Sequence, residues 1–191
     1  MKKTLTELAV IKAGHPFRGK IEEIKDGNVY AIQIRDLDDF GHIKDWMKVV
    51  RTEIAGRKLP DWLEPGDVLF AARGQRNFAV CVNDAPSRTV CGPHFFQIHV
   101  RDKHQLLPEF LTWVLNQKPA QRYFEQSAEG SAQLSIRKAV LENIQITIPC
   151  LATQQSVVAL DQATIREKRI LKALIENRDK EMQFIAQEIL G

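Results

Sequence analysis

The chain has 191 residues, of which 44% are hydrophobic and 27% charged, a composition typical of a globular protein with a real core. No apolar run approaches 18 residues and the N-terminus lacks a cleavable signal, so we expect a cytoplasmic protein without a membrane span. Three cysteines without a CxxC pair indicate a reducing cytosol and not a disulfide scaffold. The net charge of +3 does not by itself indicate DNA binding, but its whole excess lies in residues 1–150, because residues 151–191 are neutral.

The first hundred residues are predicted to be rich in strands. Turn sequences such as "KDGN" and "EPGD" stand before runs of apolar and β-branched residues. The expected strands are 29–34, 68–72, 78–82 and 95–100, and the second and third form a hairpin. The segment 40–63 shows no pattern that predicts an element.

Helices are predicted after residue 105. Pro108 and Pro119 each stand near a helix start, and Ser135 is expected to cap a short helix over 135–143. A strand over 144–149 follows and ends at Pro149. Residues 1–150 are therefore predicted to form one mixed α+β domain.

Residues 151–191 are predicted to form one long helix. From Thr153, the expected N-cap, to Leu190 there is no glycine or proline, which allows a helix of roughly 57 Å. Apolar residues recur every three or four positions and favour a coiled coil with a partner helix, although the helix could instead lie on its own domain. The expected dimer or partner positions are Val157, Leu160, Leu171, Leu174, Ile175, Met182, Ile185 and Ile189.

Motifs for catalysis or nucleotide binding are missing from the sequence. It contains no GxSxG, GxxxxGK[ST] or GxGxxG, and no Asn/Asp-Pro-Pro-aromatic motif of adenine methyltransferases. Cys91, His94 and His99 make at most half of a zinc site. We therefore predict no catalytic residue, cofactor or metal ion.

Two polar loops are candidates for DNA contact. "ARGQRNF" (72–78) and "GSAQLSIRK" (130–138) each combine cations with side chains that can bind phosphates or base edges, although a solvated loop is an equal alternative for the first. Further cations stand at Arg18, Lys20 and Arg35. The complete set of candidates is Arg18, Lys20, Arg35, Arg73, Gln75, Arg76, Asn77, Ser131, Gln133, Arg137 and Lys138.

The order of the segments resembles one half of a specificity (S) subunit of type I restriction–modification systems. Three stretches carry this resemblance: "NVYAIQIRDLDDFGHI", "LEPGDVLFAARGQRNFAVCV" and "LLPEFLTWVLNQKPAQRYFEQSAEGSAQLSIRKAVLENIQITIPCLATQQ". The second contains the Gly-Asp turn, apolar strand, Arg-Gly loop and returning strand that are most recognisable in that family.

The resemblance implies a target recognition domain over 1–150 and a spacer helix over 151–191. Such subunits bind double-stranded DNA and recruit modification (methyltransferase) and restriction subunits, with no catalysis of their own. This chain has one domain and one helix where two of each are usual in that family. It is therefore expected to be either a half-size subunit that forms a homodimer through residues 153–190, or a fragment, or a relative with another role. The alternatives are a DNA-binding regulator without a methyltransferase partner, a coiled-coil interaction protein, and an enzyme with a scattered active site.

Overall fold

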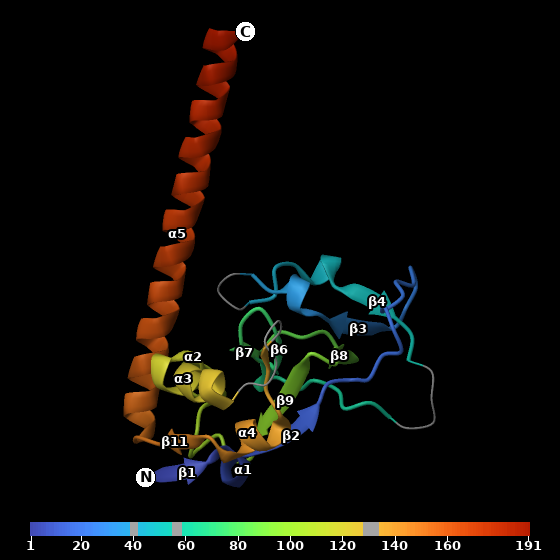
Figure 1. Ribbon diagram of the computed structural model, residues 1–191, viewed down its shortest axis with the longest axis vertical. Coiled ribbons are helices and arrows are strands. Elements are labelled where there is room, and N and C mark those ends of the chain that lie inside the picture. The colour runs from blue at the N-terminus through green and yellow to red at the C-terminus, as the bar shows by residue number, and fades with distance from the viewer. Residues whose placement is uncertain (39–41, 55–58, 128–133) are drawn as a thin grey trace. The chain divides into compact units, whose positions relative to one another are not determined.

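The structure, a computed structural model, describes residues 1–38, 42–54, 59–127 and 134–191 (Figure 1). The chain divides into two compact units, Met1–Gln155 and Ser156–Gly191. The first unit mixes sheets and helices and the second is helical, which confirms the predicted fold class. No helix in the described ranges has both the length and the apolar character needed to cross a membrane.

The elements are short except for the last. The strands are β1 (Lys2–Thr4), β2 (Ala9–Ala13), β3 (Val29–Ile32), β4 (Val50–Thr52), β5 (Asp67–Ala71), β6 (Arg73–Gly74), β7 (Phe78–Val82), β8 (Thr89–Cys91), β9 (Phe95–Val100), β10 (Leu134–Ser135) and β11 (Gln145–Thr147). The helices are α1 (Leu5–Leu8), α2 (Pro108–Asn116), α3 (Lys118–Ser127), α4 (Lys138–Asn143) and α5 (Leu151–Leu190), with 3-10 turns η1 (Ile34–Asp36) and η2 (Trp46–Lys48).

A four-stranded antiparallel sheet in the order β2-β9-β5-β7 is the centre of the first unit. Every residue of β5 is buried, as expected for an apolar strand with neighbours on both sides. The predicted strands 68–72, 78–82 and 95–100 are found as β5, β7 and β9, and β5 and β7 form the predicted hairpin.

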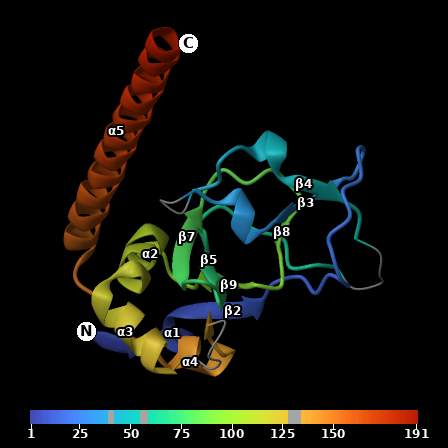
Figure 2. The ribbon, with the colours of Figure 1, turned by 45° about the horizontal axis from the view of Figure 1, so that its top comes forward.

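A second sheet, β4-β3-β8, packs on one face of the central sheet. Ile32 of β3, Leu69 of β5 and Val80 of β7 belong to one buried cluster, which joins the two sheets. On the opposite face, the ring of Phe70 lies 4.8 Å from that of Phe124 in α3. Figure 2 shows this layering, with α2 and α3 on one side of β5 and β7, and the second sheet on the other.

The domain closes where its first and last strands meet. β1 and β11 pair antiparallel, with Lys3 opposite Ile146. The strand predicted over 144–149 is thus confirmed in narrower bounds, whereas its partner β1 was not predicted.

Two predicted helix caps are wrong. Ser135 lies in β10 with its backbone paired to Arg73, so α4 begins only at Lys138, after Arg137. Thr153 lies inside α5, because the amide of Gln154 already donates to the Cys150 carbonyl at 3.1 Å and the helix begins at Leu151. The predicted long helix itself is confirmed.

Candidate nucleic-acid interface

The first predicted DNA loop is the tip of the β5–β7 hairpin. Arg73, Gln75 and Arg76 are exposed there, and Gly74 has φ of +149°, a conformation that favours glycine. Asn77 differs from the expectation, because it is buried and its Nδ2 donates to the Ala71 carbonyl at 2.9 Å. The side chain of Asn77 therefore bridges the two ends of the loop, and Asn77 is not a candidate DNA contact in this structure.

The second predicted DNA loop lies directly beside the first. β10 pairs antiparallel with β6, so that Leu134 is opposite Gly74 and Ser135 opposite Arg73. The pairing continues where the Ile136 amide donates to the Ala72 carbonyl at 2.9 Å, and the Ile136 side chain is buried. Two polar loops far apart in the sequence thus share one antiparallel ladder, and Arg137 and Lys138 follow it immediately.

The turn η1 contributes a third segment to the same region. A Cβ added to Gly74 would lie 3.6 Å from Cδ1 of Ile34, the residue next to Arg35. A cleft of about 340 Å³ lies between the two segments and is lined by Ile34, Leu37, Asp38, Gly74, Gln75, Arg76 and Phe78. The structure therefore brings η1, the turn that contains Arg35, to the region of the 73–77 loop.

We call the exposed side chains of these three segments the β6–β10 face: Arg35, Arg73, Gln75, Arg76, Arg137 and Lys138. Its charges are mixed, because Lys138 forms an ion pair with Glu142 at 3.3 Å and Arg35 lies 3.9 Å from Asp36. The guanidinium of Arg76 lies over the Phe78 ring, 5.2 Å from its centroid, which orients this side chain at the cleft. Ser131 and Gln133 lie outside the described residues.

Arg18 and Lys20 lie in a different part of the domain. They flank Gly19 in the connection from β2 to β3, where Phe17 and Ile21 pack against Val29, Ala31 and Val90 of the second sheet. In Figure 1 this connection lies beside β3 and β4, away from β6. The sequence alone does not reveal this separation, because it does not show which cation-bearing loops lie together in space.

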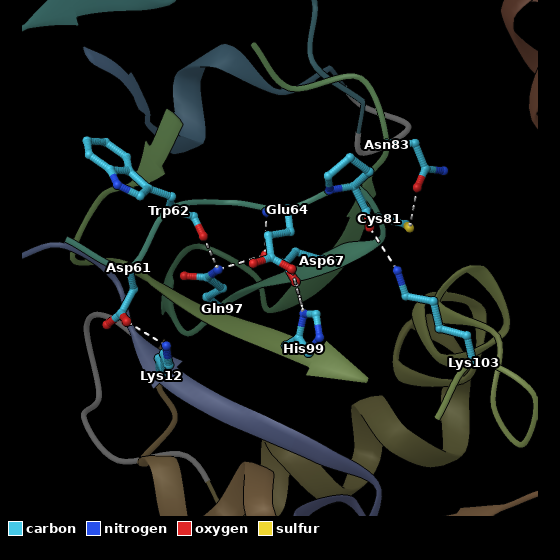
Figure 3. A network of polar contacts seen from close by, with 11 residues as sticks. Lys12, Asp61, Trp62, Glu64, Asp67, Cys81, Asn83, Gln97, His99 and Lys103 are labelled. Atoms are coloured by element: carbon cyan, nitrogen blue, oxygen red, sulfur yellow. Dashed lines mark hydrogen bonds and ion pairs between the residues drawn. The ribbon is translucent and has the colours of Figure 1, made fainter. Parts of the chain in front are cut away.

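A buried carboxylate organises the region around the Gly-Asp turn (Figure 3). Asp67 is 0% exposed and its Oδ2 accepts hydrogen bonds from the Glu64 amide at 2.8 Å and from Gln97 Nε2 at 2.7 Å. His99 Nδ1 lies 2.8 Å from Asp67 Oδ1 and donates to it, since a carboxylate only accepts. The sequence identified "EPGD" as a turn but gave no sign that its aspartate ties β5 to β9.

The histidines and cysteines near this turn do not form a metal site. Cys91 is buried among apolar side chains, and His99 is engaged with Asp67. Within the described ranges, no three side chains of His, Cys, Asp or Glu gather closely enough to hold a metal ion.

The comparison with protein families matches residues 1–177 to the type I restriction modification DNA specificity domain. The chain belongs to this family. The resemblance drawn from the ordered segments is thereby confirmed. A comparison with curated protein sequences gives no significant match.

Solved structures of S subunits share the fold of this specificity-domain chain. The S subunit of a type I restriction–modification system from M. genitalium is 16% identical, with a TM-score of 0.61, and the match covers 94% of this chain and 42% of that one. The HsdS subunit from Thermoanaerobacter tengcongensis is 20% identical, with a TM-score of 0.65 and coverage of 91% and 39%. A chain from a structure described as the basis of complex assembly and conformational transition of the type I R-M system is 20% identical, with a TM-score of 0.68 and coverage of 100% and 44%.

The specificity-domain chain thus spans less than half the length of each of these three structures.

Proposed function

We propose that this chain provides DNA sequence specificity to a type I restriction–modification complex and performs no catalysis itself. The observation that carries the proposal is the β6–β10 ladder, which joins two cation-bearing polar loops on one face of a domain from the specificity family. A modification (methyltransferase) subunit and a restriction subunit are the proposed protein partners.

The chemistry of the β6–β10 face suits double-stranded DNA. Arginine guanidinium groups bind phosphate and can donate two hydrogen bonds to guanine, and the amide of Gln75 can both donate to and accept from adenine. Lys138 is proposed as a phosphate contact. Arg18 and Lys20 remain proposed contacts outside this face, and Ser131 and Gln133 remain proposed contacts on the 130–138 segment.

Salt titration of DNA binding tests the face. We expect Arg73→Ala with Arg76→Ala to weaken binding and to reduce the slope of log K against log salt by about one to two, because each lost phosphate contact removes about 0.9. The matched control is Lys2→Ala with Arg101→Ala, two exposed cations outside the face. A wild-type affinity and slope in the first double variant would remove the face from the DNA site.

The second unit supports a proposed homodimer. Helix α5 runs for 40 residues, and its expected partner positions Leu171 and Ile175 are 54% and 62% exposed. A row of exposed apolar side chains on one helix is stable when a second helix covers it. Two identical domains related by a two-fold axis would then read two inverted half-sites, on the order of one to two DNA turns apart.

Sedimentation tests the dimer. We expect Leu171→Glu with Ile175→Glu to give a monomer with weakened DNA binding, because each copy would place charges in the apolar contact. The matched control, Ile170→Glu with Phe184→Glu, changes exposed apolar residues outside the predicted row. An unchanged dimer mass in the first variant would refute this interface.

Purification of a tagged chain from cells that contain a modification subunit distinguishes the proposal from a DNA-binding regulator that works alone. We expect a stoichiometric complex, and its absence under conditions where the chain binds DNA would favour the regulator.

A further inference from the structure

The most completely enclosed polar side chain at the start of α5 belongs to Gln154. It is 0% exposed and lies in the first turn of the helix, still within the first compact unit. Its Oε1 accepts a hydrogen bond from the Leu107 amide at 2.9 Å. Its Nε2 donates to the carbonyls of Gln105 and Pro149, each at 2.9 Å.

These three hydrogen bonds link two connecting segments that lie outside the helices and strands. Gln105 and Leu107 lie in the connection before α2, and Pro149 lies between β11 and α5. Both Nε2 hydrogens and the Oε1 are used, so the amide satisfies three backbone groups at once. A glutamate would place oxygen against two carbonyls, and a methionine of similar length would leave all three groups without partners.

The length of α5 makes this attachment important for DNA reading. A 40-residue helix is roughly 60 Å long. A rotation of about 5° at its base moves its far end by about 5 Å, more than the rise of one base pair, about 3.4 Å. A pair of such chains can therefore select one half-site spacing only if the first turn of each helix is held firmly.

We infer that Gln154 is a positioning residue for the spacing of the two half-sites, acting through the first turn of α5 and not through contact with DNA. The inference depends on the proposed function, because it assumes that two copies read one bipartite target. Its prediction is specific: loosening this turn broadens the range of accepted spacings without changing which bases are read.

The test uses the full chain with its modification subunit and duplexes that carry the target with different spacings. We expect the wild type to prefer one spacing over its neighbours one base pair away by about 100-fold. In Gln154→Met and Gln154→Glu we expect this preference to fall to less than about 10-fold, with unchanged affinity for a single half-site. The matched control is Gln155→Met, which changes the adjacent and exposed glutamine.

The possible outcomes distinguish failure of the proposed bipartite DNA reading from failure of the positioning role of Gln154. If the wild type shows no spacing preference, the proposed bipartite reading fails. If the wild type shows one and Gln154→Met retains it, the positioning role is refuted. Two further outcomes also refute the positioning role, because Gln154 would then serve stability alone. In the first, Gln154→Met and Gln154→Glu unfold whereas Gln155→Met stays folded. In the second, the Gln154 variants lose affinity for a single half-site but keep the spacing preference.

Discussion

The substitution Asp67→Ala is expected to destabilise the first unit strongly, and the structure allows its cost to be worked out. Asp67 accepts hydrogen bonds from the Glu64 amide, Gln97 Nε2 and His99 Nδ1. Gln97 is buried and the Glu64 amide is partly buried, so both would lose a partner that water replaces poorly. The His99 side chain is 41% exposed and can bind water instead.

Gln97 Nε2 keeps its hydrogen bond to the Trp62 carbonyl, so it loses one of two acceptors. Each buried N–H group left without a partner costs about 1–3 kcal/mol, so the two N–H groups together should cost about 2–6 kcal/mol. The stability of a whole domain is only about 5–15 kcal/mol. With an m-value of about 2 kcal/mol/M in urea, the unfolding midpoint should fall by about 1–3 M.

Urea unfolding followed by tryptophan fluorescence measures this effect, because all three tryptophans lie in the first unit. The control is Asp61→Ala, which removes a carboxylate that is 47% exposed and paired with Lys12, and should cost at most about 1 kcal/mol. If Asp67→Ala changes the free energy of unfolding no more than Asp61→Ala does, the carboxylate does not organise the turn as argued.

Two further predictions concern single residues. Burial raises the pKa of the Cys81 and Cys91 thiols to about 12, whereas a hydrogen bond from Thr153 lowers the pKa of the exposed Cys150 thiol. With a disulfide reagent at pH 8 we therefore expect one thiol to react fast, and Cys150→Ser to remove that fast reaction. A fast thiol that persists in Cys150→Ser would contradict this assignment. Asn77→Ala should cost about 1–2 kcal/mol of stability, because it removes the hydrogen bond from Asn77 to the Ala71 carbonyl. Gln75→Ala should leave the melting temperature unchanged and weaken DNA binding. Equal stability of the two variants would refute the structural role of the Asn77 side chain.

The sequence predicted best the elements whose signal is local. The strands β5, β7 and β9 are apolar runs between turn residues, and α2 begins at a proline, so a short window contains all the information needed. Segment 40–63 showed no pattern because β4 has only three residues, too few for alternation to appear.

The pairing of distant segments and the buried polar side chains could not be predicted in this way. The ladder between β6 and β10 involves two residues from each strand, and its register depends on how the whole domain closes. The three partners of the Gln154 side chain are backbone carbonyl and amide groups, which nearly every residue carries, so the sequence does not distinguish this glutamine from Gln155. The same limit explains why Asn77 looked like a DNA contact.

The β6–β10 face separates the groups that hold its shape from those that are proposed to touch DNA. Its backbone is fixed by the pairing of Ser135 with Arg73, by the Ile136 amide and by the buried Asn77. The side chains of Arg73, Gln75 and Arg137 are exposed on this frame. Exposed side chains contribute little to stability, typically within about 0.5 kcal/mol. A domain built this way can exchange the side chains that are proposed to touch DNA while the frame stays folded.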